Sequence, residues 1–376
     1  MPLSGLYIHI PFCKQACNYC NFHFSTSLGQ KEALLAAMHI ELEQRAPQWR
    51  QPLQTVYFGG GTPSVLSAQE INALWTTLAQ HYSLTEGMEV TLEANPDDLT
   101  MDYVQELRDT PINRFSIGIQ SFFEEDLQWM NRAHNAQQAR ACLETAQAAG
   151  FDQLTIDLIY GGPTTSHERW ATNLATVFEL QVPHLSCYAL TVEPNTALAH
   201  QIKTGKRSAV NDAHAAEQFD YLLEQIAAQG YEQYEISNFC RPPHYAQHNS
   251  NYWTGAPYLG IGPAAHSFDG QHRRWNISHN PKYIKALTTG ERYWEQELLT
   301  VQDQHNEYIM TALRTKWGVN LERLAHWGTN VVPQFEEQAK RYLERGWIQK
   351  QQQTYVLTDQ GKFLADAIIS DFFWTD

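Results

Sequence analysis

The sequence predicts an α/β protein: a partial (β/α)6 barrel followed by a smaller helical, winged-helix-like domain. Three observations lead to this prediction. Six short apolar segments alternate with helix patterns over about the first 200 residues, as in a parallel sheet covered by helices. Glycines and polar residues recur where these segments end. Six units are too few to close an eight-stranded barrel, so we expect an open one.

Each of the six segments is predicted to be a strand because it is rich in β-branched and aromatic residues and is bounded by Gly, Pro or Asn. The segments are 6–11, 55–61, 89–96, 114–120, 153–161 and 184–191. Helix signals fall between them. Ser67-Ala-Gln-Glu70 is a capping box, and Asn135 opens a helical pattern that stops at Gly150. The alternation therefore predicts the barrel over residues 1–200.

The remaining chain is predicted to form a connecting region over 201–300 and a C-terminal cap over 301–376. The connecting region holds a helix over 212–228, stopped at Gly230, and then a Pro- and His-rich segment where no helix is predicted. In the cap, helices near 308–316, 321–327 and 333–345 precede a hairpin over 347–357 and a last helix. This order resembles a winged-helix module. Such modules often bind DNA, but ten acids against eight bases favour a cap packed on the barrel.

Composition excludes several classes of function. The 376 residues carry a net charge of −15, which argues against nucleic-acid binding by charge. No stretch approaches the roughly 20 apolar residues of a membrane span, and the N-terminus lacks the basic region of a signal peptide. Cysteines without a disulfide pattern favour a reducing cytosol. We therefore expect a cytoplasmic protein without a transmembrane segment.

Three cysteines lie within eight residues, Cys13, Cys17 and Cys20, with the spacing C-x3-C-x2-C. The other three cysteines are scattered singly, so no second C-x-x-C pair exists to complete a tetrahedral zinc site. Three thiolates fall one short of the four that close a 4Fe-4S cluster. A cluster held in this way leaves one iron open to a small molecule.

Other polar residues lie near the ends of the predicted strands. The run Gly59-Gly60-Gly61-Thr62-Pro63 lets the backbone approach a ligand closely. Glu93 and Asp157 are acids within apolar segments, and a buried carboxylate needs a partner. A structural ion pair and a hydrogen bond to a ribose or an ammonium group both meet that need. Gln120 and Arg132 can add an amide and a guanidinium to the same cavity.

The cysteine run, preceded by Tyr7-Ile-His-Ile-Pro-Phe12 and followed by the glycine motif, resembles the radical S-adenosylmethionine (SAM) superfamily. The resemblance implies that SAM completes the cluster and is split to a 5′-deoxyadenosyl radical. By residue-by-residue match, the cluster-bound SAM would contact Tyr7, Gly60 and Glu93. A second SAM site would be lined by Gly61, Thr62, Gln120, Arg132 and Asp157.

The combined motifs HIPFCxxxCxYC, GGGTP, LEANP, IGIQSF, NRAH and IDLIYG are similar to one family in particular. It contains oxygen-independent coproporphyrinogen III dehydrogenase and the HemW heme chaperones. Three features favour the HemW branch: Phe22 where the dehydrogenase has a further cysteine, a start only six residues before Tyr7, and the HNxxYW motif at His248. The resemblance implies binding of heme and its transfer to an acceptor protein. The alternative is radical decarboxylation of coproporphyrinogen III.

His248 is the candidate heme ligand, because a neutral imidazole can ligate heme iron and nearby aromatic side chains can pack on a porphyrin. His244 and His266 compete with it, and a hydrogen-bonding role is the alternative. His9 and His23 flank the cysteine loop and are expected to support it. The sequence leaves open the heme acceptor, a peripheral membrane contact and a homodimer.

Overall fold

The computed structural model describes residues 4–375. Its main sheet has twelve strands, of which β1 to β6 are parallel and adjacent in chain order. The predicted partial (β/α)6 barrel is therefore confirmed. These strands span Ser4–Ile10, Leu53–Gly60, Leu84–Ala94, Arg114–Gln120, Gln153–Tyr160 and His184–Ala189.

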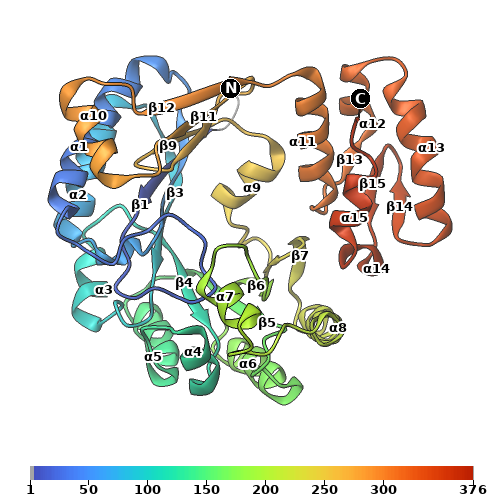
Figure 1. Cartoon of the computed structure of the whole chain (residues 1–376), viewed down its shortest axis with the longest axis horizontal. Helices are drawn as coiled ribbons and strands as arrows, with labels where there is room; N and C mark the ends of the chain where they lie inside the picture. The colour runs from blue at the N-terminus through green and yellow to red at the C-terminus, as the bar shows by residue number, and fades with distance from the viewer. Residues whose placement is uncertain (1–3, 376) are drawn as a thin grey trace.

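Helices cover the outer face of this sheet (Figure 1). The predicted capping box is present: the Ser67 hydroxyl accepts from the Glu70 N–H, and the Glu70 carboxylate accepts from the Ser67 N–H. Asn135 caps the fifth helix, and Gly150 after it has a φ of +83°. The helices between the strands are α1 (Lys31–Arg45), α2 (Ala68–His81), α3 (Met101–Leu107), α4 (Glu124–Met130), α5 (Ala136–Ala148) and α6 (His167–Glu179).

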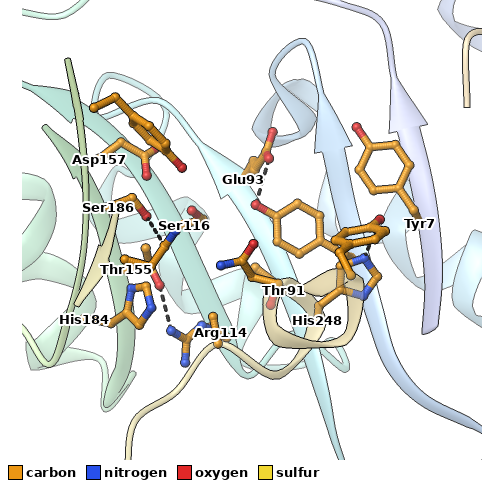
Figure 2. Close-up of a pocket in the computed structure, with 16 residues that line it drawn as sticks. Tyr7, Thr91, Glu93, Arg114, Ser116, Thr155, Asp157, His184, Ser186 and His248 are labelled. Atoms are coloured by element: carbon orange, nitrogen blue, oxygen red, sulfur yellow. Dashed lines mark hydrogen bonds between the residues drawn. The ribbon is translucent and has the colours of Figure 1, made fainter. Parts of the chain in front are cut away.

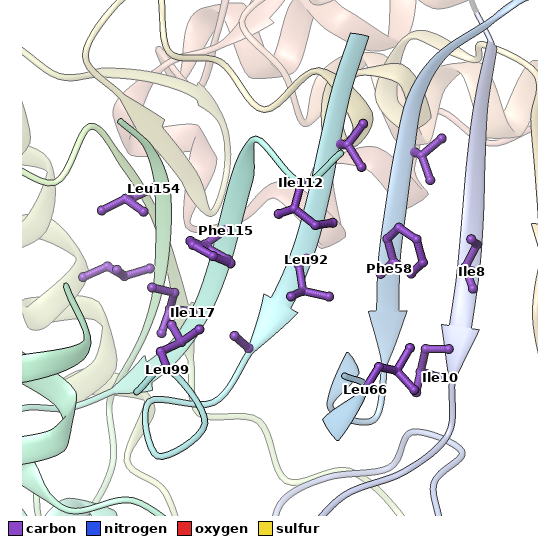
Figure 3. Close-up of a cluster of buried hydrophobic side chains, with 14 of the residues drawn as sticks. Ile8, Ile10, Phe58, Leu66, Leu92, Leu99, Ile112, Phe115, Ile117 and Leu154 are labelled. Carbon is purple, nitrogen blue, oxygen red and sulfur yellow. The ribbon is translucent and has the colours of Figure 1, made fainter. Parts of the chain in front are cut away.

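The apolar core lies between the strands and these helices. Ile8, Phe58, Leu92 and Phe115 come from four neighbouring strands and are fully buried on the helix-covered face (Figure 3). Side chains alternate along a strand, so the residues between them face the barrel interior. Many of these are polar. One interior row, in register across β1 to β4, is Tyr7, Tyr57, Thr91 and Arg114.

The segment after β6 extends the main sheet at both edges. β8 pairs with β6, and β9 pairs with β1, so the predicted connecting region over 201–300 contributes to the barrel sheet itself. The added strands are β7 (Glu232–Glu235), β8 (Asn238–Cys240), β9 (Tyr258–Ile261), β10 (His266–Phe268), β11 (His272–Asn276) and β12 (Trp294–Leu298). The helices of this region are α7 (Ala197–Lys203), α8 (Asp212–Ala228), α9 (Gln247–Thr254) and α10 (Asn280–Thr289).

The HNxxYW motif lies on α9, where the sequence predicted no helix. Ala246 at the N-cap provides no side-chain cap. The Glu89 carboxylate on β3 replaces it, accepting hydrogen bonds from the backbone N–H groups of Gln247 and His248, each at 2.9 Å. The helix packs against β1 and β2 and ends at Gly255, whose φ is +74°.

The C-terminal part has its own apolar cluster, which includes Ile309 and Phe335. Its first helix begins at Val301 and not near 308 as predicted, because Thr300 and Asp303 form a capping box. It joins the barrel by backbone hydrogen bonds between the segments around 234–236 and 314–316. The elements are α11 (Val301–Leu313), β13 (Val319–Asn320), α12 (Leu321–Leu324), α13 (Val331–Glu344), β14 (Ile348–Gln351), β15 (Thr354–Leu357), α14 (Asp359–Lys362) and α15 (Ala365–Ser370). β15 lies between β13 and β14 in an antiparallel sheet, the arrangement of a winged-helix-like domain.

Candidate functional site

The three cysteines occupy the loop after β1, at the carboxyl end of the parallel strands. Their side chains are half-buried and line one cavity of about 530 Å³. The loop is tied to its surroundings on two sides. Lys14 forms an ion pair with Asp97 at 3.1 Å, and the Asn131 side-chain amide donates to the Ala16 carbonyl at 2.7 Å. Asn131 takes the left-handed conformation (φ +57°) at the end of α4.

The cysteine thiols are chemically suited to bind iron. Burial raises the pKa of Cys13 to about 11 and also raises the pKa of Cys20, so both thiols hold their protons until a metal displaces them on binding. Within residues 4–375, the three sulfur atoms do not gather closely enough to share one metal ion. In a multi-iron cluster each iron takes one cysteine sulfur, so the three sulfurs need not meet at a single ion.

Arg132 lies beside the cysteines. Its Nη1 donates to the Cys17 sulfur at 3.2 Å, and its Nη2 donates to Asn95 Oδ1 at 2.7 Å and to the Gly118 carbonyl at 2.8 Å. An arginine stays protonated in a protein, so this guanidinium stabilises thiolate charge. The resemblance assigned Arg132 to a second SAM site, which stays a prediction; in the structure its guanidinium contacts the cysteine loop.

Glu93 near the carboxyl end of β3 meets the glycine motif at the carboxyl end of β2. Figure 2 shows the Glu93 side chain beside the barrel cavity. One carboxylate oxygen accepts from the Tyr57 hydroxyl at 2.7 Å, and the other accepts from the Gly60 N–H at 3.1 Å. Gly60 has a φ of +115°, which favours glycine. Burial raises the pKa of Glu93 to about 7. Each carboxylate oxygen keeps a further lone pair, so Glu93 can also accept a hydrogen bond from an ammonium group.

The same cavity collects most of the predicted SAM residues. Gln120 ends β4 with a φ of +66°, and burial raises the pKa of Asp157 on β5 to about 6. A Cβ on Gly61 would lie 2.6 Å from the Phe12 carbonyl oxygen, so only glycine fits there. The predicted residues that line the cavity with the cysteines are Gly60, Gly61, Thr62, Glu93, Gln120, Arg132 and Asp157.

Tyr7 and His248 line an adjoining cavity of about 230 Å³ in the barrel interior. Glu93 and Asp157 border both cavities. The Tyr7 hydroxyl and His9 Nδ1 lie 3.2 Å apart, while His9 Nε2 donates to the His23 carbonyl at 3.0 Å. The His9 ring therefore holds the backbone just after Cys20, whereas the His23 ring contacts Asn280 Oδ1 at 2.8 Å.

His248 is buried, with 3% of its surface exposed. Its Nδ1 lies 2.7 Å from the Thr55 hydroxyl, and its Nε2 lies 3.0 Å from the Tyr252 hydroxyl. Burial lowers the pKa of His248 to about 3, so the ring is neutral, with one N–H and one lone pair. Both are used within the protein. Ligation of heme iron through His248 requires one of these hydrogen bonds to break.

Sequence reasoning missed Tyr57, Asn95 and Asn131, which hold Glu93, Arg132 and the cysteine loop. A signal for Tyr57 was present: it lies two residues before Gly59, on the interior face of a predicted strand. Asn131 directly precedes Arg132, but its left-handed backbone has no marker in the sequence. The two competing histidines lie elsewhere: His244 contacts Gln153, and His266 is exposed on β10.

Comparison with known proteins places these features in a family. The radical SAM superfamily model matches residues 7–175, and the HemN C-terminal domain model matches residues 299–364. Among solved structures, coproporphyrinogen III oxidase (HemN) from Escherichia coli has a TM-score of 0.84 at 24% identity. The likeness covers 99% of this chain and 90% of that chain and shows the shared fold. These matches show that the chain has the radical SAM fold.

Relatives that match nearly the whole chain identify its family. The chain is 34% identical to the heme chaperone HemW of Mycobacterium tuberculosis, over 97% of this chain and 93% of the relative. It is 30% identical to HemW of Bacillus subtilis, over 98% and 99% of the two chains. It is 31% identical to HemW of Escherichia coli, over 99% and 98%. The chain belongs to the HemW family.

Proposed function

We propose that this protein is a heme chaperone of the cytoplasm that binds heme and transfers it to an acceptor protein, and that it carries a 4Fe-4S cluster completed by SAM. One observation carries the cofactor part: three cysteines share one cavity with Gly60, Glu93 and the other predicted SAM residues. The HemW relatives, similar over nearly the whole chain, support the heme part. In the described part of the chain, each helix is too short or too polar to cross a bilayer.

The residues fit this cofactor pair. Cys13, Cys17 and Cys20 would hold three irons, and Glu93 would accept a hydrogen bond from the amino group of SAM. Gln120, Arg132 and Asp157 offer an amide, a guanidinium and a carboxyl group for hydroxyl and carboxylate groups of the same ligand or of a second SAM. The cavity volume of about 530 Å³ lies in the usual range for small-molecule sites. Cluster and SAM together supply one-electron chemistry when bound.

The mouth of the cavity suits a flat apolar ligand. Phe22 lines it, and 69% of the Phe22 side chain is exposed. Phe24 and the partly exposed Tyr188 line the same cavity. Exposed aromatic rings beside a cofactor pocket offer stacking surfaces for a porphyrin. A cysteine at the Phe22 position would instead add a reactive thiol.

The second candidate is oxidative decarboxylation of coproporphyrinogen III. The shared fold with HemN and the presence of Gln120, Arg132 and Asp157 in the cavity favour it. It predicts turnover of the porphyrinogen, with methionine and 5′-deoxyadenosine as products.

A direct test reconstitutes the cluster anaerobically, adds SAM, and offers heme and coproporphyrinogen III in separate reactions. We expect a stable heme spectrum, transfer of heme to an apoprotein such as apomyoglobin, and no decarboxylated product. Stoichiometric decarboxylation would overturn the chaperone proposal. The Cys13→Ser/Cys17→Ser/Cys20→Ser variant is the matched control without a cluster. Gel filtration of the same samples, with and without SAM and heme, tests for a homodimer.

A further inference from the structure

We propose that His248 is a positioning residue for the SAM pocket: its ring holds Tyr57 in place and, through Tyr57, holds the Glu93 carboxylate. The inference rests on the proposed SAM site. It assigns to the HNxxYW motif a task inside the barrel that does not require the histidine to touch heme.

A continuous set of contacts leads from α9 to the glycine motif. Figure 2 shows His248 and Glu93, two of the side chains that take part. The His248 ring stacks on Tyr57, with centroids 5.0 Å apart and planes at 22°. The Tyr57 hydroxyl donates to Glu93 at 2.7 Å, and Glu93 accepts from the Gly60 N–H at 3.1 Å. His248 is therefore linked to Gly60 through only two intervening side chains.

His248 is itself held firmly. Its backbone N–H donates to Glu89 on β3 at 2.9 Å, and its ring contacts the hydroxyls of Thr55 on β2 and Tyr252 on α9. Three separate hydrogen bonds fix both the backbone and the plane of the ring. A ring fixed in this way can act as a rigid support for Tyr57, because the ring cannot shift without breaking these hydrogen bonds.

Tyr57 needs this support because it is tightly packed near Gly59 but also borders a cavity. On one side, a Cβ on Gly59 would lie 2.7 Å from Tyr7 and 2.8 Å from Tyr57, so the packing there is tight. On the other side lies the cavity of about 230 Å³, which both Tyr57 and His248 line. Removal of the imidazole enlarges that cavity, and Tyr57 loses its contacts on that face. We expect the phenol to tilt into the cavity and its hydroxyl to leave Glu93.

Two variants of His248 separate this role from heme ligation. His248→Ala removes the ring, and His248→Phe keeps a flat ring but cannot ligate iron. We expect His248→Ala to raise the Kd for SAM about tenfold, and His248→Phe to restore most of the affinity. The readout is the electron paramagnetic resonance spectrum of the reduced cluster, which changes when SAM binds the open iron. Iron content reports cluster assembly, and His326→Ala is the control on an exposed histidine of the C-terminal part.

A double-mutant cycle distinguishes a specific link between His248 and Tyr57 from a general loss of stability. Tyr57→Phe removes the hydroxyl that holds Glu93, so His248→Ala should add little to its effect on SAM binding. Additive losses, or a His248→Ala affinity within twofold of the parent, would overturn the inference. If the parent itself shows no response to SAM, the proposed function fails and this inference with it. Loss of heme binding in both His248 variants with unchanged SAM affinity would assign the residue to heme alone.

A different observation assigns a second site, for one divalent transition-metal ion such as Zn²⁺, to His167, His214 and Glu217. Their ligand atoms lie within 4.8 Å of one another. His167 is the first residue of α6, while His214 and Glu217 are three residues apart on α8 and so share one face of that helix. His167 Nε2 and Glu217 Oε2 are already 3.0 Å apart.

The tautomer of His214 favours metal binding. Its Nε2 lies 2.9 Å from the Thr165 carbonyl oxygen, which can only accept, so Nε2 carries the proton. With the proton on Nε2, Nδ1 is the nitrogen that a metal can bind. Metal-bound histidines usually donate their second N–H to such an oxygen, which fixes the orientation of the ring. Two imidazoles and one carboxylate form a known zinc ligand set with room for water. The bound ion would link the N-terminus of α6 to α8.

Equilibrium dialysis of the cluster-loaded chain against Zn²⁺ under anaerobic conditions tests this site, with zinc and iron measured together. We expect about one Zn²⁺ per chain, its loss in His214→Ala, and at least tenfold weaker binding in Glu217→Gln. His326→Ala, which changes another exposed histidine, should bind as the parent does. Equal zinc content in the parent and His214→Ala would overturn the assignment.

Discussion

At the scale of single residues, Glu93 and Asp157 should make the stability of the fold depend on pH. Burial raises the pKa of Glu93 from its ordinary value of 4.5 to about 7, and raises that of Asp157 from 3.8 to about 6. The folded chain therefore keeps protons that the unfolded chain has released. Between about pH 4 and pH 7, the free energy of unfolding falls as pH rises, because the folded state binds more protons than the unfolded state.

Glu93→Gln should remove the contribution of Glu93 to that slope. Without SAM, we expect the variant to be more stable than the parent by about 2 kcal/mol at pH 8, with a much smaller gain at pH 5. Urea unfolding at both pH values measures the difference. The exposed Glu86→Gln should change stability little at either pH. An equal gain at pH 5 and pH 8 would contradict the buried-carboxyl explanation.

Sequence patterns identified many residues of the candidate site because the chemistry of each is local. The spacing of the three cysteines identifies Cys13 as a candidate metal ligand. The position of Gln120 at the end of a predicted strand identifies it as a candidate site residue. Contacts between distant segments had no such marker. Tyr57 is informative only once His248 and Glu93 are known to flank it, and those residues come from other parts of the chain.

At the scale of elements, α9 depends on a cap from another strand. The Glu89 carboxylate accepts from two backbone N–H groups of the first turn of α9 and lies 3.8 Å from Arg114. Glu89→Ala leaves these buried groups without a partner, and we expect a loss of about 2 kcal/mol. Hydrogen exchange should rise first in α9, over Gln247–Thr254. Glu86→Ala on an exposed part of β3 is the control, and uniform exchange across the sheet would contradict a local role.

The cap of α2 offers a simpler case. Ser67 and Glu70 form a reciprocal capping box, so Ser67→Ala should cost about 1 kcal/mol. Thermal or urea unfolding measures this loss. Ser67→Asn keeps a capping oxygen and should recover most of it. If Asn and Ala destabilise the chain equally, the cap is not the source of the effect.

The caps also explain which helix boundaries could be predicted. Residues 212–228 matched α8 because Asn211 and Gly230 mark its ends locally. α11 began earlier than expected, although Thr300 and Asp303 formed a readable capping box. α9 could not be predicted from its own residues, since its cap is a carboxylate on β3.

At the scale of the whole molecule, the barrel and the C-terminal part have separate apolar clusters. Phe335 is central to the second and only 3% exposed, so Phe335→Ala should cost that part about 4 kcal/mol. We expect hydrogen exchange to rise over residues 301–375 while the barrel strands stay protected. Phe115→Ala should do the reverse, because Phe115 belongs to the barrel cluster. Loss of protection everywhere in both variants would show one cooperative unit.

The order of parallel strands was predictable because each strand and its helix carry their own signals. The two-sided extension of the sheet was not, since β9 returns to pair with β1 and β8 pairs with β6 only after a long excursion of the chain. Pairings between distant segments depend on the assembled sheet and leave little trace in local composition.

The polar interior has a consequence for how such a scaffold diversifies. The packing that stabilises the sheet lies on the face covered by helices, where Phe58 and Leu92 are buried. Positions such as Thr91 and Ser116 face a hollow space and carry little of that packing. Interior side chains can therefore be exchanged at modest cost to folding. A lineage can in this way keep its architecture and its cysteine loop while it replaces one ligand, or one task, with another.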